Sequence, residues 1–345
     1  MPPARSNDPQ ELFAAAREGD HASLARLLSL IERGGAPARQ VAAIAYRSKL
    51  VGYTVGMTGA PGAGKSTLTD RLIGLARRGL PGGDDPDAAA AAAGPDLVGV
   101  LAIDPTSPFS GGAILGDRVR MPSHSVEDGV FIRSMATRGQ LGGLAVAVPD
   151  AVRVLSASGF PVILIETVGV GQQEVEVASA TDTTVVVVNP GWGDSIQANK
   201  AGLMEIADLF VINKADRAGT RQTHRDLDRM LDMTELAGWR PPIVETVAST
   251  GDGVDEVWEA IGSHRHHLIG HGLLDGFRRQ RLEREFRQIL VARVEQRIRS
   301  MEGTESLGAL MDALDHGDVD PYEAADRLLE EMALSDPGLR SNGVA

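Results

Sequence analysis

The stretch VGMTGAPGAGKSTLTD, residues 55–70, joins an apolar, β-rich run to a helical pattern through a turn of glycines and one lysine. Its central segment GAPGAGKS, residues 59–66, fits the pattern G-x-x-x-x-G-K-[ST] and stands between a predicted strand and a predicted helix. Glycines let successive backbone N–H groups turn towards an anion, and the N-terminus of the following helix favours negative charge. The stretch therefore predicts a phosphate-binding loop inside an α/β domain.

In this loop we expect Lys65 to contact the β- and γ-phosphates of a nucleotide and Ser66 to place its hydroxyl on Mg²⁺. A buried lysine at a glycine-rich turn is hard to explain without a bound anion. The loop does not by itself distinguish ATP from GTP, or a kinase from a switch protein. The loop residues predicted to bind the nucleotide are Gly59, Ala60, Pro61, Gly62, Ala63, Gly64, Lys65, Ser66 and Thr67.

The fold class follows from the pattern around this loop. From residue 51 to about residue 270, short β-rich runs alternate with helical ones. The β-rich runs are almost continuously apolar, which is typical of strands covered on both faces. We therefore predict an α/β P-loop fold with a mainly parallel sheet flanked by helices. The predicted strands are residues 51–59, 97–104, 130–136, 161–167, 183–189, 208–214 and 241–248.

Helical extensions are predicted on both sides of this domain. Residues 1–50 are predicted to form an N-terminal helical extension, residues 51–270 the P-loop domain, and residues 271–345 a C-terminal helical arm. In the arm, apolar residues fall along one face of a long helix, as expected for an element that packs on a second subunit. These residues are Leu282, Phe286, Ile289, Leu290 and Val294.

Composition excludes several classes of function. The formal net charge is −13, which disfavours an extended nucleic-acid interface or an anionic membrane surface. The sequence contains no cysteine, so disulfides, thiolate metal sites and cysteine nucleophiles are excluded. No apolar run reaches the ~20 residues that a membrane-spanning helix needs, and the first residues lack the apolar core of a secretory signal. We therefore expect a cytoplasmic protein.

The segment LFVINKAD, residues 209–216, is predicted to select the base. Guanine presents two adjacent donors, N1–H and the N2 amino group, which one carboxylate accepts together, whereas adenine offers no such pair on that edge. Asp216 is the predicted guanine ligand, with the stem of Lys214 over the ring and Asn213 linking this segment to the phosphate loop. In isolation the same segment would suit a strand-to-helix turn with aspartate as the helix cap.

The next strand ends in TVAST, residues 246–250. The backbone N–H groups of Ala248 and Ser249 are predicted to meet the guanine O6. Many strand ends share such a sequence, so this prediction depends on the position of the segment after residue 216.

Carboxylates at two strand ends are predicted to surround the γ-phosphate. Asp104 ends one strand, and the glycine-containing loop after it leads to Asp117. Glu166 ends another strand, and the N–H of Gly169 follows it. Oxygen ligands of this kind suit Mg²⁺. Loss of the γ-phosphate would release the flanking loops, which provides two states.

Hydrolysis is expected to be slow in the absence of a partner. Lys65, Asp104 and Glu166 are the predicted catalytic residues, and they act by positioning and charge stabilisation. Either Gln172 or Gln173 is a candidate to orient the attacking water, and spacing does not choose between them.

Taken together, the motifs resemble the MeaB/ArgK family of GTPases, which are associated with methylmalonyl-CoA mutase and related adenosylcobalamin mutases. The similar segments include GAPGAGKST, AIDPTSPFSGGAILGDRVRM, FIRSMATRGQLGGLA, ETVGVGQ and GDSIQANKAGLMEIADLFVINKAD, and the resemblance covers roughly residues 10–335. A linked series of this kind is far more specific than any one motif. Two positions depart from the pattern: Val247 stands where relatives often have serine, and Gln173 stands where they often have serine.

The resemblance implies a GTPase chaperone that controls delivery of adenosylcobalamin to its mutase and protects or reactivates that enzyme. It implies that Mg²⁺ and the γ-phosphate are surrounded by Lys65, Ser66, Asp104, Asp117 and Glu166. It also implies a homodimer formed through the C-terminal helices. A further switch that reports to the mutase is implied at GWGDSIQANKAG, with Asp194, Gln197 and Lys200 as the coupling residues.

Two other functions remain as alternatives. A metal-insertion GTPase would need ligands, and His264, His267 and His271 lie near one face of a predicted helix, where a solvated helix end is the simpler interpretation. An ATPase that energises basic amino-acid transport is suggested by the older name of the family. Asp216 argues against ATP, and no membrane segment is predicted.

Overall fold

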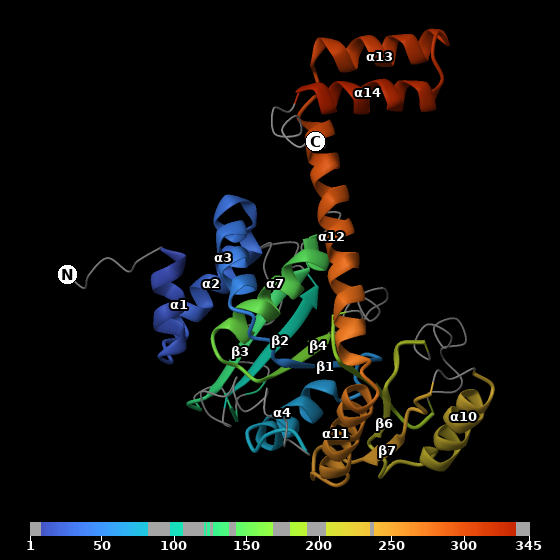
Figure 1. The fold of residues 1–345 in the computed structure, drawn as a ribbon. Helices are drawn as coiled ribbons and strands as arrows, with labels where there is room; N and C mark the ends of the chain where they lie inside the picture. The colour runs from blue at the N-terminus through green and yellow to red at the C-terminus, as the bar shows by residue number, and fades with distance from the viewer. Residues whose placement is uncertain are drawn as a thin grey trace. The chain divides into compact units, whose positions relative to one another are not determined.

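One parallel sheet of seven strands forms the centre of the computed structural model, which describes residues 8–81, 97–105, 121, 123–124, 127–137, 143–167, 180–191, 205–234 and 238–335. The strand order is β3-β2-β4-β1-β5-β6-β7 (Figure 1). All seven predicted strands are present, and the α/β fold is confirmed. Their bounds are β1 Tyr53–Gly59, β2 Val98–Pro105, β3 Val130–Thr137, β4 Val162–Thr167, β5 Thr183–Val188, β6 Leu209–Asn213 and β7 Ile243–Thr246.

Each central strand is apolar throughout because both faces of the sheet are covered. In β5, Val185 and Val187 belong to the core formed with α4 (Lys65–Ala76) and α11 (Val254–Gly270). The alternate residues Val186 and Val188 face the opposite side. A strand with a core on each face needs β-branched residues at successive positions, which explains the run TTVVVV.

The second face carries the N-terminal helices. The helices α1 (Pro9–Arg17), α2 (His21–Arg33) and α3 (Gly35–Arg47) lie beside α7 (Gly143–Ala157) (Figure 1), and the four helices share one apolar core. The N-terminal helices predicted for this fold are thus present. Aspartates cap the first two helices, since Asp8 accepts from Gln10 N–H and Asp20 accepts from Ala22 and Ser23 N–H. On the same face α10 (Thr220–Asp232) covers β5 and β6.

A long helix, α12 (Leu274–Arg299), contacts the residue before β5 and the helix α7 through charged side chains. Arg278 donates to both oxygens of the buried Asp182, at 3.1 and 2.8 Å, and Arg281 donates to the same carboxylate. One turn further along, the buried Glu285 accepts from Arg153 of α7 at 2.7 Å. Residues 278, 281 and 285 share one face of the helix.

Three residues of the apolar stripe predicted on this helix are exposed and take no part in these contacts. Phe286 is 64 % exposed, and Leu282 and Leu290 are also exposed. Ion pairs, not the apolar stripe, therefore fasten the start of α12 to the P-loop domain.

Asp182→Asn is expected to lower the free energy of unfolding at neutral pH by about 3–5 kcal/mol, because it removes the anion between two partly buried arginines. Burial alone would raise the pKa of Asp182, but Arg278 and Arg281 outweigh it and lower the pKa to about 2. Since the folded pKa lies below the ordinary value of 3.8, the stabilisation is complete above about pH 4 and is lost as the pH falls towards 2. Urea denaturation of the wild-type protein and of Asp182→Asn between pH 2 and pH 7 measures their free energies of unfolding. The difference between the two free energies should become smaller below pH 4. If the difference in free energy of unfolding did not change with pH, the ion pairs of Asp182 would not be its source.

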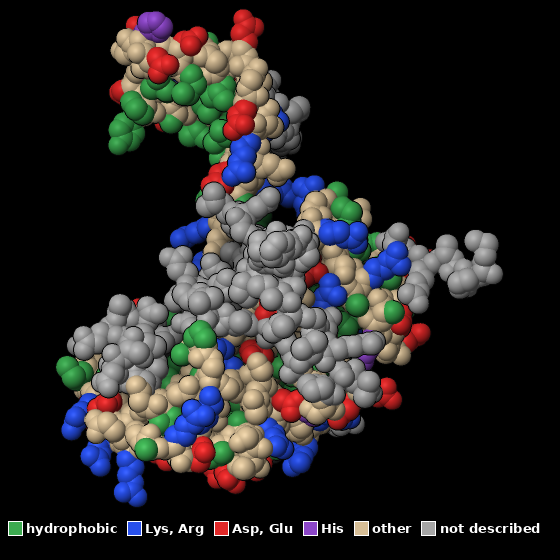
Figure 2. Space-filling view, turned by 180° about the vertical axis from the view of Figure 1, so that it is seen from behind, with side chains coloured by type: hydrophobic (Ala, Val, Ile, Leu, Met, Phe, Trp, Pro, Cys, Tyr) green, Lys and Arg blue, Asp and Glu red, His purple; other side chains and the backbone are tan. Residues whose placement is uncertain are grey.

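The chain divides into two compact units, residues 1–286 and 287–345. In the second unit α13 (Glu305–His316) and α14 (Pro321–Ser335) form a pair linked by a hydrogen bond between Ser306 and Glu331. Hydrophobic side chains gather on one face of this pair (Figure 2), and Met311, Tyr322 and Leu329 are all more than half exposed. Exposed apolar side chains that gather on one face of a helical pair suit contact with another protein surface.

Candidate nucleotide site

The phosphate loop lies at the carboxyl end of β1, between β4 and β5. Gly59, Gly62 and Gly64 have φ of 129°, 74° and 91°, which only glycine adopts without strain. The helix α4 begins at Lys65 directly after the loop. The loop backbone and the α4 N-terminus therefore form the anion-binding arrangement that the sequence predicts.

The predicted phosphate ligand Lys65 is buried, with 6 % of its surface exposed. Its ammonium donates to Gly59 O at 2.5 Å and to Ala60 O at 3.1 Å. These bonds fold the Lys65 side chain back over the phosphate loop. The positive charge of its ammonium therefore lies next to the loop backbone.

Two glycines of the loop are expected to differ in their tolerance of alanine. A Cβ on Gly59 would stand 2.0 Å from Val187 O on the neighbouring strand, so Gly59→Ala is expected to lower the free energy of unfolding by roughly 3 kcal/mol or more. A Cβ on Gly62 would meet nothing within 4 Å, so Gly62→Ala should cost only the about 1–2 kcal/mol of a left-handed residue. Urea denaturation of the two variants measures the difference. Equal losses of unfolding free energy in the two variants would show that contact with Val187 on β5 does not restrict residue 59 to glycine.

Two carboxylates lie beside the loop on adjacent strands. Glu166 on β4 pairs with Ala102 on β2, and Asp104 is two residues beyond Ala102, so both acids point to the face of the sheet that α4 covers. Each is about 1 % exposed. Ser66, in the first turn of α4, donates its hydroxyl to Glu166. The structure thus brings together three of the four predicted metal ligands.

The chemistry of these three residues fits Mg²⁺. They offer one hydroxyl and two carboxylates, all hard oxygen donors, at the edge of a phosphate loop. Two buried carboxylates on one face also favour a nearby cation, because like charges in a medium of low polarity repel strongly.

On the other side of the loop, Asn213 ties three segments together. Its Nδ2 donates to Ala63 O at 2.8 Å, and its Oδ1 accepts from Thr246 Oγ1 at 3.2 Å and from Ala248 N at 3.1 Å. Asn213 is 2 % exposed. The predicted link between this segment and the phosphate loop is confirmed.

Lys214 and Asp216 follow at the end of β6. Lys214 has φ of 61°, which is uncommon for a residue with a side chain. Its ammonium donates to Gly62 O at 2.5 Å, so its stem spans the gap between β6 and the phosphate loop. The Asp216 side chain is exposed, and no hydrogen bond from a described residue engages its carboxylate. The carboxylate is therefore accessible to a ligand.

The two amides predicted to meet guanine O6 differ in the structure. Ala248 N–H already donates to Asn213, whereas Ser249 N–H donates to no acceptor in the described part of the chain. Arg71 of α4 donates to the carbonyls of both residues, at 3.2 and 2.8 Å. The sequence did not single out Arg71, since an arginine on an exposed helix face has no motif that marks it.

Other predicted residues lie outside the described residues. These are the metal candidate Asp117, the γ-phosphate contact Gly169, the water-orienting candidates Gln172 and Gln173, and the coupling residues Asp194, Gln197 and Lys200.

The histidines weighed as metal ligands have structural contacts instead. His264 is 3 % exposed, and its Nδ1 lies 2.9 Å from Thr183 Oγ1, so a solvated helix end is wrong for this residue. Burial lowers the pKa of His264 to about 4. The rings of His267 and His271 stack on each other. No group of three or more histidine, aspartate or glutamate side chains suited to a metal occurs within the described ranges.

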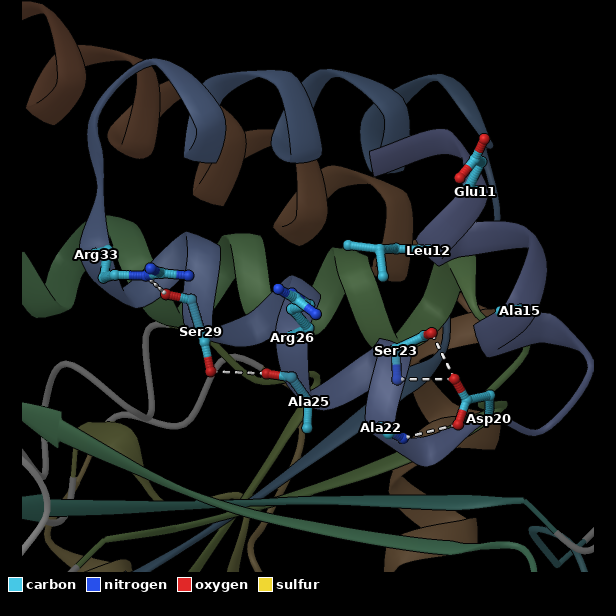
Figure 3. A pocket seen from close by; sticks show the side chains of 10 residues that line it. All are labelled: Glu11, Leu12, Ala15, Asp20, Ala22, Ser23, Ala25, Arg26, Ser29 and Arg33. Carbon is cyan, nitrogen blue, oxygen red and sulfur yellow. Dashed lines mark hydrogen bonds between the residues drawn. The ribbon is translucent and has the colours of Figure 1, made fainter. Parts of the chain in front are cut away.

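A groove of about 620 Å³ lies away from the nucleotide site, on α1 and α2 (Figure 3). Arg26 and Arg33 line it together with Glu11 and Asp20, so its formal charges cancel. None of its lining residues belongs to the phosphate loop or the base segments. Among the described helices, none combines the length and the apolar character that crossing a bilayer requires.

Comparison with known families agrees with this geometry. The family described as "Methylmalonyl Co-A mutase-associated GTPase MeaB" matches residues 24–303, which include the phosphate loop, both strand-end carboxylates and the base segments. The chain belongs to this family.

Relatives of this MeaB-family GTPase cover most of its length. A "Putative GTPase" of Pyrococcus abyssi is 47 % identical over 328 residues, covering 93 % of this chain and 96 % of the relative. The "GTPase ArgK" of Escherichia coli is 34 % identical over 283 residues, covering 78 % and 80 %. A solved structure described as a "LAO/AO transport system kinase" is 24 % identical, covers 95 % of this chain and 99 % of its own, and has a TM-score of 0.68. That structure supports the fold alone. The resemblance predicted from the motifs is thus confirmed, and the chain is a GTPase of the MeaB/ArgK family.

Proposed function

We propose that this GTPase controls the delivery of adenosylcobalamin to methylmalonyl-CoA mutase, or to a related acyl-CoA mutase, and protects or reactivates that enzyme. The observation that carries the proposal is the match of residues 24–303 to a family described by its association with this mutase. The contacts among the described residues support a nucleotide-dependent switch at the centre of that match.

In the proposed site, the loop amides and Lys65 bind the phosphates, and Asp216 accepts N1–H and N2–H of guanine. Asn213 is positioned to transmit a change between the phosphate-binding and the base-binding parts of the site. It bonds to Ala63 of the phosphate loop and to Ala248 of the loop after β7. We propose Ser66, Asp104, Asp117 and Glu166 as the residues that hold Mg²⁺. When bound, Mg²⁺ supplies positive charge that offsets the negative charge of the phosphates.

Ser66 and Glu166 are bonded to each other in this structure. Because Ser66 gives only its hydroxyl hydrogen to this bond, the lone pairs of its oxygen remain available for a metal. We propose that loss of the γ-phosphate changes the structure locally at the end of β4, where Glu166 lies. Gly169 and the coupling residues Asp194, Gln197 and Lys200 are proposed to extend this change to the mutase.

A homodimer formed through residues 271–345 completes the proposal. The exposed apolar residues of α12 and the outer surface of α13 and α14 supply the surface for it. Sedimentation equilibrium of the full chain measures the oligomeric state directly.

The function is tested by measuring GTP hydrolysis alone and with an adenosylcobalamin-dependent acyl-CoA mutase, together with co-purification of the two proteins. We expect a complex and a higher rate of hydrolysis when the mutase is present. A protein of similar size that binds no cobalamin serves as the control. No complex and no change in rate would contradict the assignment of this client.

A further inference from the structure

Arg71 connects the phosphate loop helix to the loop after β7, which joins two parts of the site that are remote in sequence. Its Nε donates to Ala248 O at 3.2 Å, and its Nη2 donates to Ser249 O at 2.8 Å. These bonds span 177 and 178 residues. A guanidinium suits this task because its donors form a rigid fork that engages two neighbouring carbonyls at once.

The direction of one amide follows from these bonds. In a trans peptide the carbonyl of one residue and the N–H of the next point in opposite directions. Because Ala248 O points to Arg71 on α4, the N–H of Ser249 points away from α4. The preceding N–H, that of Ala248, is directed to Asn213.

Backbone hydrogen bonds within the loop after β7 hold its conformation. Val247 N donates to Asp252 O at 2.9 Å, and Thr250 and Gly251 N–H both donate to Val247 O. The peptide between Ala248 and Ser249 therefore has its carbonyl bonded to Arg71 and only its N–H available. A single oriented backbone donor at a base site selects for an acceptor, such as the O6 of guanine, and against the amino group that adenine carries there.

We propose that Arg71 is a positioning residue that sets the discrimination for guanine O6, by orienting the N–H of Ser249. The inference rests on the proposed guanine site, in which Asp216 contacts the N1–H and N2 edge. Arg71 itself touches no nucleotide in this arrangement and acts through the loop after β7.

The experiment measures dissociation constants by calorimetry for three nucleotides: GDP, 6-thio-GDP and IDP. In 6-thio-GDP a weak sulfur acceptor replaces O6 while N1–H and the N2 amino group remain, and IDP lacks only the N2 amino group. The proteins are wild type, Arg71→Ala and Arg71→Gln. Arg77→Ala is the matched control, because Arg77 follows the same helix but bonds to Glu127 and to Asp128 O.

Wild type is expected to bind GDP about 3- to 10-fold more tightly than 6-thio-GDP, the range of one neutral hydrogen bond. In Arg71→Ala this preference should fall to nearly 1, while the preference for GDP over IDP is unchanged. Arg71→Gln keeps one donor and should restore part of the preference, and Arg77→Ala should behave as wild type.

The outcomes separate this inference from the site on which it rests. If wild type does not distinguish GDP from IDP, the proposed Asp216 contact fails and the inference fails with it. If wild type distinguishes GDP from both analogues and Arg71→Ala keeps its full preference over 6-thio-GDP, the inference alone is overturned. An equal loss of affinity for all three nucleotides in Arg71→Ala would also overturn it, since it would show a general structural role. Thermal unfolding confirms that each variant is folded.

Discussion

Lys65→Ala is expected to abolish detectable GTP binding at micromolar protein and to lower hydrolysis by about 10²–10³-fold or more, while the fold is retained. Bonds to Gly59 O and Ala60 O place the Lys65 ammonium at the loop backbone. Charge-assisted bonds to phosphate are among the strongest in proteins, and removing one preorganised donor from a transition state typically costs this much in rate.

The control for this variant is Lys49→Asn, which also removes one positive charge. Lys49 is exposed, and its φ of 57° is one that asparagine tolerates. Calorimetry with GTP and circular dichroism of both variants complete the experiment. Retained nucleotide affinity in a folded Lys65→Ala protein would remove the phosphate-loop assignment.

Asp216→Asn is expected to exchange the base specificity of the site. The variant should lose about 10²–10³-fold in affinity for GDP, because an amide cannot accept from both guanine donors and bonds to charged groups are worth about 1.5–3 kcal/mol each. It should gain affinity for xanthosine diphosphate, in which an acceptor replaces the N2 amino group and pairs with the new amide donor.

Asp326→Asn is the matched control, since Asp326 is an exposed aspartate on α14, which carries neither the phosphate loop nor the base segments. Titration of both variants with GDP and xanthosine diphosphate tests the exchange. Unchanged GDP affinity in Asp216→Asn would show that the carboxylate does not contact guanine. Because Asp216 is exposed, loss of folding is not expected to complicate this result.

Most of the fold was predictable from local pattern. The seven strands are long apolar runs, and a parallel sheet covered on both faces requires such runs, so their places in the sequence were correct. The phosphate loop was predictable for a related reason: positive φ at Gly62 and Gly64 demands glycine, and the loop must precede a helix. The link made by Asn213 was predicted from its place in the motif, and its bond to Ala63 O confirms it.

Other features could not be predicted because they depend on residues far apart in the sequence. Arg278, Arg281 and Glu285 fasten α12 through the buried Asp182 and the partly buried Arg153, which lie far away in the sequence. The packing of the apolar stripe on a second subunit stays a prediction. His264 seemed to belong to a solvated helix end, but the helix turns it onto Thr183 at the start of β5. In both cases the buried partner decides the orientation.

The sequence alone determined the parallel sheet, the phosphate loop, the family and the candidate residues for nucleotide and metal, because each depends on spacing within a short segment. The tertiary structure decided which of these residues touch. It paired Ser66 with Glu166 across 100 residues, directed the Ala248 amide to Asn213, and placed Arg71 on two carbonyls of the base loop. Such contacts arise from the register of neighbouring strands and the position of α4 over them, and no local pattern of residues encodes either.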